Sequence, residues 1–154
     1  MNRIGLSIEK SETLAKELNH LLANYQVFYA NARGFHWNIK GEKFFELHEK
    51  FEALYNDLFL KIDEVAERIL TLGGQPVHTF QDFLDLSELE VKKGVSSASE
   101  TVQAVLESFE NIISLQRSIM EMAGEASDEG TSALMSDYIR EQEKEVWMYS
   151  SYLA

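Results

Sequence analysis

Two pairs of side chains in the first half of the sequence could bind a metal ion. His48 and Glu52 are four residues apart, and so are Asp63 and Glu67. Residues at this spacing lie on the same face of a helix. Imidazole and carboxylate groups are natural ligands for iron, manganese and zinc. Either pair alone is also typical of an ordinary solvated helix face, so the distance between the pairs decides which interpretation applies.

That distance excludes a site built from one helix. Glu52 and Asp63 are 11 residues apart, which is close to three helical turns, so both pairs face the same way. Along the helix axis this separation corresponds to ~16 Å. The ligands of one metal ion must lie within ~4–5 Å of each other. One helix therefore cannot bring both pairs to the same ion.

Two copies of the helix, packed antiparallel across a two-fold axis, can bring the pairs together. In such an arrangement the numbers of facing residues have a constant sum. His48 with Glu67 gives 115, and Glu52 with Asp63 also gives 115. One register therefore satisfies both pairs and creates two equivalent sites, as a two-fold interface requires. The spacing predicts a metal site that is shared between subunits.

A further candidate ligand, His36, comes before the helix that carries these pairs. We expect it at the C-terminal end of an earlier helix, just before the chain turns into the next one. It can therefore lie beside His48. A histidine at a helix end also commonly caps backbone carbonyl groups, so both roles remain open. His20 and His78 lack comparable neighbours and are expected to be structural or exposed.

The pattern of apolar residues predicts the elements that position these side chains. Apolar residues recur at three- and four-residue steps, which indicates helices, over 14–36, 44–72, 97–123 and 134–153. Glycine-containing breaks separate these segments. Within the long connection between the second and third, Phe80, Phe83 and Leu84 share one face of a short helix over 80–86. The sequence thus predicts one all-α domain over residues 1–154, a ferritin-like four-helix bundle with a short extra helix in its long crossover.

Four stretches of the chain carry a family resemblance, at residues 35–41, 44–52, 63–69 and 72–76. With the spacing H-x11-H-x3-E-x10-D-x3-E, they resemble the signature of the Dps family. These are the DNA-binding proteins from starved cells, also called mini-ferritins. The resemblance covers nearly the whole chain, and the spacing is highly specific. Position 52 departs from the best-known members, because they have aspartate where this chain has Glu52.

The resemblance implies an iron-oxidising (ferroxidase) protein that forms a shell of twelve subunits. His36, His48 and Glu52 would bind two irons per site together with Asp63 and Glu67 of the partner subunit. The family oxidises iron(II), preferably with hydrogen peroxide, and stores the ferric mineral inside the shell, which protects against oxidative stress. Trp37 would then be an oxidisable ring that absorbs stray oxidising equivalents. Its alternative role is that of a core or interface aromatic.

Composition narrows the possible partners. The formal net charge is −12, from 14 basic and 26 acidic residues. DNA binding needs Lys and Arg to neutralise phosphates, so the alternative function, DNA compaction, is disfavoured. No apolar run reaches the ~18 residues of a membrane span. The first residues lack the apolar core of a signal peptide. The chain has no cysteine, which fits the cytoplasm expected for it.

Acidic residues also gather around the connection between the last two long helices, at Glu121, Glu125, Asp128, Glu129 and Asp137. They form either a solvated loop or a funnel that concentrates cations at a three-fold axis.

Two rival interpretations involve no shared site. A conventional di-iron enzyme needs Glu-x-x-His on two helices of one bundle, and only Glu17 with His20 fits that motif. The other rival is a bundle without metal chemistry, in which the acidic pairs serve only solubility.

Overall fold

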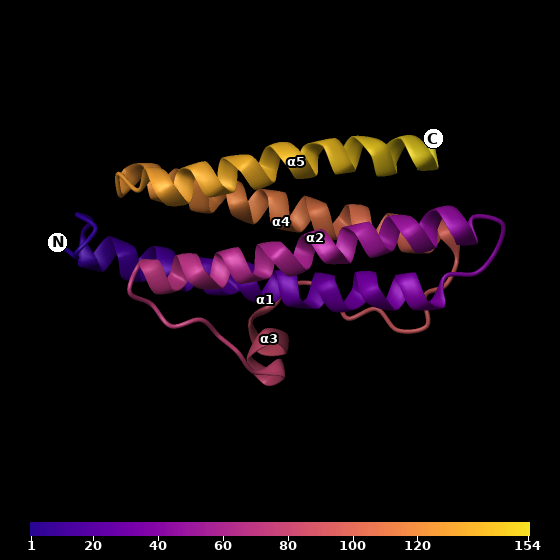
Figure 1. Cartoon of the computed structure of the whole chain (residues 1–154), viewed down its shortest axis with the longest axis horizontal. Coiled ribbons are helices and arrows are strands. Elements are labelled where there is room, and N and C mark those ends of the chain that lie inside the picture. The colour runs from indigo at the N-terminus through magenta and orange to yellow at the C-terminus, as the bar shows by residue number, and fades with distance from the viewer.

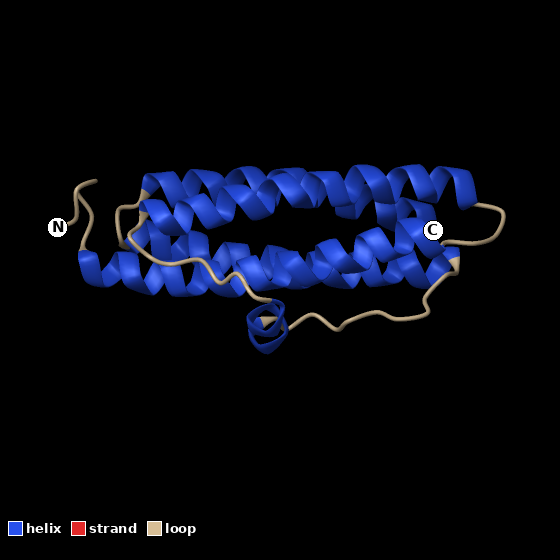
Figure 2. Ribbon diagram, turned by 60° about the horizontal axis from the view of Figure 1, so that its bottom comes forward, coloured by secondary structure: helices blue, strands red, loops and turns tan.

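The computed structural model describes residues 1–154 and contains five helices and no strands. Four of the helices are long and lie side by side along the molecule, whereas the short α3 lies outside them (Figures 1 and 2). The helices are α1 (Ile8–Asn38), α2 (Phe44–Thr71), α3 (Phe80–Leu86), α4 (Ala98–Glu125) and α5 (Glu129–Leu153). The predicted all-α bundle, with a short helix in its crossover, is confirmed. None of these helices combines the length and apolar character needed to cross a membrane.

The helix ends follow local capping chemistry. Ser97 Oγ accepts a hydrogen bond from the Glu100 amide (3.3 Å) and donates one to Glu100 Oε2 (2.9 Å), which caps the start of α4. Gly73 ends the turn after α2 with φ +90°, a conformation that favours glycine. Several ends differ from the sequence prediction. α1 spans Ile8–Asn38 rather than 14–36, α4 continues through Gly124 to Glu125, and α5 begins already at Glu129 rather than at 134.

The topology is that of two antiparallel helix pairs joined by the crossover. α1 packs against α2, α4 packs against α5, and α1 also contacts α4. The crossover leaves the end of the bundle where α2 stops and reaches the opposite end, where α4 starts (Figure 1). A core of 28 buried residues, drawn mainly from the four long helices, fills the interior.

Three asparagines of α1 fasten the crossover to the bundle through its backbone. Asn19 bonds to the Gln75 carbonyl and the Val77 amide, and Asn31 bonds to the Glu90 carbonyl and the Lys92 amide. Between them, Asn24 accepts hydrogen bonds from the Ser87 hydroxyl and the Glu88 amide. These bonds satisfy polar groups of a segment that has no regular backbone pairing. α3 is thereby held on the outer side of α1.

The apolar face of α3 is not buried against its own bundle. The helix has no buried residue, and Phe80 is 85% exposed. Leu84 is also exposed. The predicted helix is therefore present, but its apolar side is open in the single chain.

Ion pairs connect α2 to α5. Lys50 pairs with Glu145 (3.0 Å), and Arg68 pairs with Asp128 (2.6 Å), which is the N-cap residue of α5. Between them Lys61 is buried, with its ammonium 2.8 Å from carboxylate oxygens of both Asp57 and Glu141. Burial alone would lower the pKa of Lys61, but its hydrogen bonds to these two carboxylates raise the pKa above its ordinary value. Lys61 therefore stays charged, and these pairs hold the ligand-bearing helix in place.

Candidate metal centre

His36 and His48 meet where α1 ends and α2 begins. Their rings stack with centroids 3.8 Å apart and planes inclined by 12°. Each imidazole also contacts the backbone of the other histidine. His36 Nδ1 lies 2.6 Å from the His48 carbonyl oxygen, and His48 Nδ1 lies 2.7 Å from the His36 carbonyl oxygen. The proximity that the sequence predicted for these two histidines is confirmed.

The two backbone contacts decide which ring nitrogen carries a proton. A carbonyl oxygen can only accept a hydrogen bond, so each Nδ1 must be the donor. In the neutral imidazole the proton is then on Nδ1, and the Nε2 lone pair is free to bind a metal. Ligating histidines commonly have their other nitrogen fixed in this way. His48 also satisfies a carbonyl in the last turn of α1, which has no partner within that helix.

The acidic members of the proposed site lie on α2 and are exposed. Glu52, Asp63 and Glu67 all point away from the core of the single chain. No group of three or more histidine, aspartate and glutamate side chains in the chain is close enough to hold a metal ion. Within one subunit, the histidine pair and the Asp63–Glu67 pair therefore remain separate.

The exposed face of α2 that carries these acids is also unusually apolar. Phe45, Phe59 and Leu70 fall on the same stripe as Glu52 and Asp63, at steps of seven and four residues. Phe45 is 79% exposed, and Phe59 and Leu70 are each 59% exposed. Large apolar side chains lined up on a surface commonly mark a protein interface.

Two aromatic residues lie close to the histidines. Trp37 is 64% exposed and lies under the Arg33 guanidinium, 5.0 Å from the ring centroid. Tyr55, on α2, presents an edge-to-face contact to His36 with centroids 5.4 Å apart. Tyr55 was not predictable as a site residue from the sequence, because at helical spacing it is indistinguishable from the other apolar positions of α2.

The interior of the bundle excludes the conventional di-iron arrangement. Tyr25, Gln116 and Gln142 form a closed ring of three hydrogen bonds at its centre, and all three are fully or almost fully buried. Burial raises the pKa of Tyr25 well above its ordinary value, so the phenol remains neutral. Glu17 and His20, the only matching motif, contact each other at 3.4 Å as partly exposed side chains. The di-iron rival within one bundle is therefore wrong.

The acidic cluster near the last helix–helix turn is smaller than its sequence suggests. Asp128 is 2% exposed, accepts hydrogen bonds from Thr131 and pairs with Arg68. Gly130 permits this packing, because a Cβ there would lie 2.8 Å from the guanidinium nitrogens. Asp128 therefore has a structural role, as the cap of α5 and the partner of Arg68. Glu121, Glu125 and Glu129 remain exposed.

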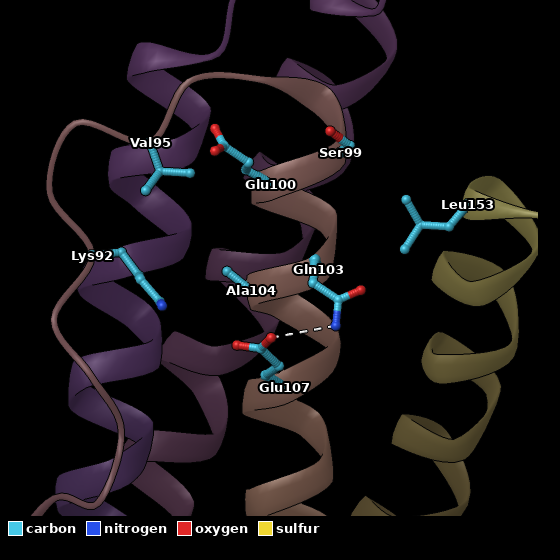
Figure 3. Close-up of a pocket in the computed structure, with 8 residues that line it drawn as sticks. All are labelled: Lys92, Val95, Ser99, Glu100, Gln103, Ala104, Glu107 and Leu153. Atoms are coloured by element: carbon cyan, nitrogen blue, oxygen red, sulfur yellow. Dashed lines mark hydrogen bonds between the residues drawn. The ribbon is translucent and has the colours of Figure 1, made fainter.

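A groove of about 490 Å³ lies away from the histidines, between the end of the crossover, the first turns of α4 and the C-terminal turn of α5 (Figure 3). Glu100, Glu107 and Lys92 supply its charged groups, and Glu107 accepts a hydrogen bond from Gln103 (3.3 Å). It contains no histidine. This groove is not a candidate metal centre.

Comparisons with known proteins place this geometry in a family. A family model described as a ferritin-like domain matches residues 15–154. The DNA protection during starvation protein of Porphyromonas gingivalis is 47% identical, over 96% of this chain and 93% of its own length. The crystal structure of the Dps protein from Vibrio cholerae O1 matches with a TM-score of 0.99 and 54% identity, over 100% of this chain and 97% of that one. The chain belongs to the Dps family.

A more distant Dps structure, from Bacillus brevis, shows how well the fold is retained. At 36% identity it still matches with a TM-score of 0.92, over 95% of this chain and 98% of that one. The ferritin-like fold predicted from the sequence is thus confirmed for this Dps chain.

We expect Asp128→Ala to lower the free energy of unfolding by ~2–4 kcal/mol, because Arg68 loses its buried partner and α5 loses its cap. Denaturation followed by circular dichroism at a fixed subunit concentration measures this loss. Glu129→Gln, in the same turn but exposed, is the matched control and should change stability little. An unchanged midpoint for Asp128→Ala, combined with slower iron uptake, would instead support a role in cation entry.

Proposed function

We propose that this chain is a ferroxidase subunit that stores iron and detoxifies it. In this proposal it forms a shell of twelve subunits and oxidises iron(II), preferably with hydrogen peroxide, at di-iron sites between pairs of subunits. The ferric product is stored as mineral inside the shell, which protects against oxidative stress. Iron(II) is the substrate of this reaction, and His36, His48, Glu52, Asp63 and Glu67 are its proposed ligands.

The observation that carries the proposal is the exposed face of α2, which holds both ligand candidates and large apolar side chains. In the register that pairs His48 with Glu67, position 45 faces position 70, because their numbers also sum to 115. Phe45 would therefore face the partner subunit's Leu70, and both side chains are exposed in the single chain. Covering such residues removes apolar surface from water and stabilises the dimer. Ligand positions and apolar positions thus support the same antiparallel arrangement.

The stacked histidines support two iron positions in each site. A metal ion bound to imidazole lies close to the plane of the ring. The His36 and His48 rings are nearly parallel and are stacked 3.8 Å apart, so an ion in the plane of one lies well outside the plane of the other. Metal ions in two-metal sites are typically ~3.5–4 Å apart. We assign His48 to the first position, and we assign His36 to the second and weaker one.

The carboxylates and the histidines have different roles in the proposed site. Glu52, together with Asp63 and Glu67 of the partner subunit, would supply oxygen ligands, which suit iron in both oxidation states. The Nδ1 hydrogen bonds keep both imidazoles oriented, with Nε2 directed away from the carbonyl contact. Hydrogen peroxide accepts two electrons when its O–O bond breaks, and two iron(II) ions supply them. Paired transfer avoids release of hydroxyl radical, and Trp37 would absorb oxidising equivalents that escape.

The relatives support iron as the substrate. The Vibrio cholerae Dps protein is described as a member of a superfamily of ferritin-like diiron-carboxylate proteins. The proposal of twelve subunits rests on the resemblance to the Dps family. The exposed acids around the turn between α4 and α5 would attract cations toward the shell.

We expect His48→Ala to slow peroxide-dependent iron oxidation by at least ~100-fold, since losing even a residue that supports a metal ligand typically costs roughly 10–100-fold. Stopped-flow absorbance of iron(III), with size-exclusion chromatography to confirm assembly, measures the effect. His78→Ala is the matched control, because His78 is exposed and contacts only the Pro76 carbonyl (3.3 Å). An undiminished rate in assembled His48→Ala would refute the assignment.

DNA compaction is the second candidate, favoured by the name of the Porphyromonas gingivalis relative. We propose that DNA is not a partner of this chain. Asn2 folds the first residues into a turn through hydrogen bonds from the Ile4 and Leu6 amides and to Ser11. Lys10 donates to the Glu125 carbonyl (2.7 Å). Lys10 is therefore held at the end of α4 rather than in a mobile cationic arm, and the net charge of −12 opposes phosphate binding.

A gel shift with plasmid at ~50 mM salt tests this directly, because phosphate contacts are strongest at low salt. We expect the assembled protein to leave plasmid migration unchanged. Retarded plasmid at this salt concentration, reversed by adding salt, would show that DNA binding belongs to the function.

A further inference from the structure

Tyr55 has an oxidisable phenol ring in direct contact with the histidine pair. It lies edge-on to His36, with centroids 5.4 Å apart and planes inclined by 65°. It is half-buried in the single chain. In the proposed register it faces the partner subunit's Leu60, which is 61% exposed before assembly. The dimer would therefore enclose a phenol beside the site where peroxide is reduced.

Tyr55 is also part of a larger aromatic cluster. Its ring contacts Tyr29 on α1, with centroids 5.9 Å apart. The Arg33 guanidinium lies 5.0 Å from the centroids of both Tyr29 and Trp37. Arg33 therefore separates the inner tyrosine pair from the exposed tryptophan.

Arg33 acts electrostatically on the two rings that it covers. A positive charge a few ångströms away disfavours removal of an electron from Trp37, because the oxidised indole first carries a positive charge beside it. No such cation covers Tyr55 among the cation–π contacts of the chain. Tyr55 contacts His36 directly, so an oxidising equivalent placed on Tyr55 would remain beside the proposed iron site.

We propose that Tyr55 supplies the second electron to peroxide when a site holds only one iron(II). This inference rests on the proposed ferroxidase function and adds a catalytic residue to it. One iron(II), one hydrogen peroxide, one proton and the tyrosine give one iron(III), two waters and a neutral tyrosyl radical. The O–O bond breaks, iron and Tyr55 each lose one electron, and the phenolic hydrogen ends in water. A later iron(II) and a proton convert the radical back to tyrosine.

This reaction prevents the release of hydroxyl radical from a site that holds only one iron(II). With one iron(II) and no second donor, peroxide reduction stops at hydroxyl radical. Trp37 is a poorer first donor than Tyr55, because it lies under the Arg33 guanidinium. Tyr55 thus intercepts the oxidising equivalent inside the interface, and Trp37 meets only what escapes.

The experiment loads the assembled protein with less than one iron(II) per site, adds one equivalent of peroxide and freezes the sample for electron paramagnetic resonance. The wild-type protein should show a tyrosyl radical, and Tyr55→Phe should lose most of that signal. A spin trap in parallel samples should report more hydroxyl radical from Tyr55→Phe than from the wild type. Tyr152→Phe is the matched control, since Tyr152 lies at the exposed end of α5 and should leave both readouts unchanged.

Absorbance of iron(III), with iron supplied at two per site, separates the two proposals. If wild-type protein fails to oxidise iron(II) under these conditions, the ferroxidase function fails and the Tyr55 proposal fails with it. If iron is oxidised normally but the radical is equally strong in Tyr55→Phe, or is a tryptophan radical in the wild type, only the Tyr55 proposal is overturned.

Discussion

The rise of an α-helix limits how this chain can bind metal. His48 with Glu52 and Asp63 with Glu67 occupy one face of α2, but ~16 Å of helix separates Glu52 from Asp63. No folding of a single straight helix removes that distance. Because of this separation, the proposed site can form only when two copies of α2 pack against each other. The exposed Phe45, Phe59 and Leu70 give that second copy an apolar surface to cover.

The rest of the bundle serves to hold α2 in place. The stacked histidines lock its first turn to the end of α1, and ion pairs from Lys50, Lys61 and Arg68 join it to α5. At the centre of the bundle, the polar groups of Tyr25, Gln116 and Gln142 form hydrogen bonds with one another and are not available as metal ligands. The outer face of α2 carries the candidate carboxylate ligands, and the proposed iron site lies there.

The sequence predicted those features that depend on local periodicity or capping. The four long helices, the short helix at residues 80–86 and the cap at Ser97 all follow from such patterns. The pairing of His36 with His48 followed because only a short turn separates their helices. Features that depend on distant partners were not predictable. Asp128 resembled its acidic neighbours until Arg68, 60 residues earlier, proved to bind it, and the roles of Asn19, Asn31 and Tyr55 depend on segments elsewhere in the fold.

Subunit mixing tests the shared site most directly. One variant carries His48→Ala and Glu52→Ala, and the other carries Asp63→Ala and Glu67→Ala. The two are dissociated, mixed in equal amounts and reassembled, with differently tagged subunits to confirm mixing. If the sites are shared, each variant alone is inactive, whereas every mixed dimer has one intact site, so the mixture regains about a quarter of the wild-type peroxide-dependent iron oxidation. Mixed assemblies that regain no activity would contradict the shared site.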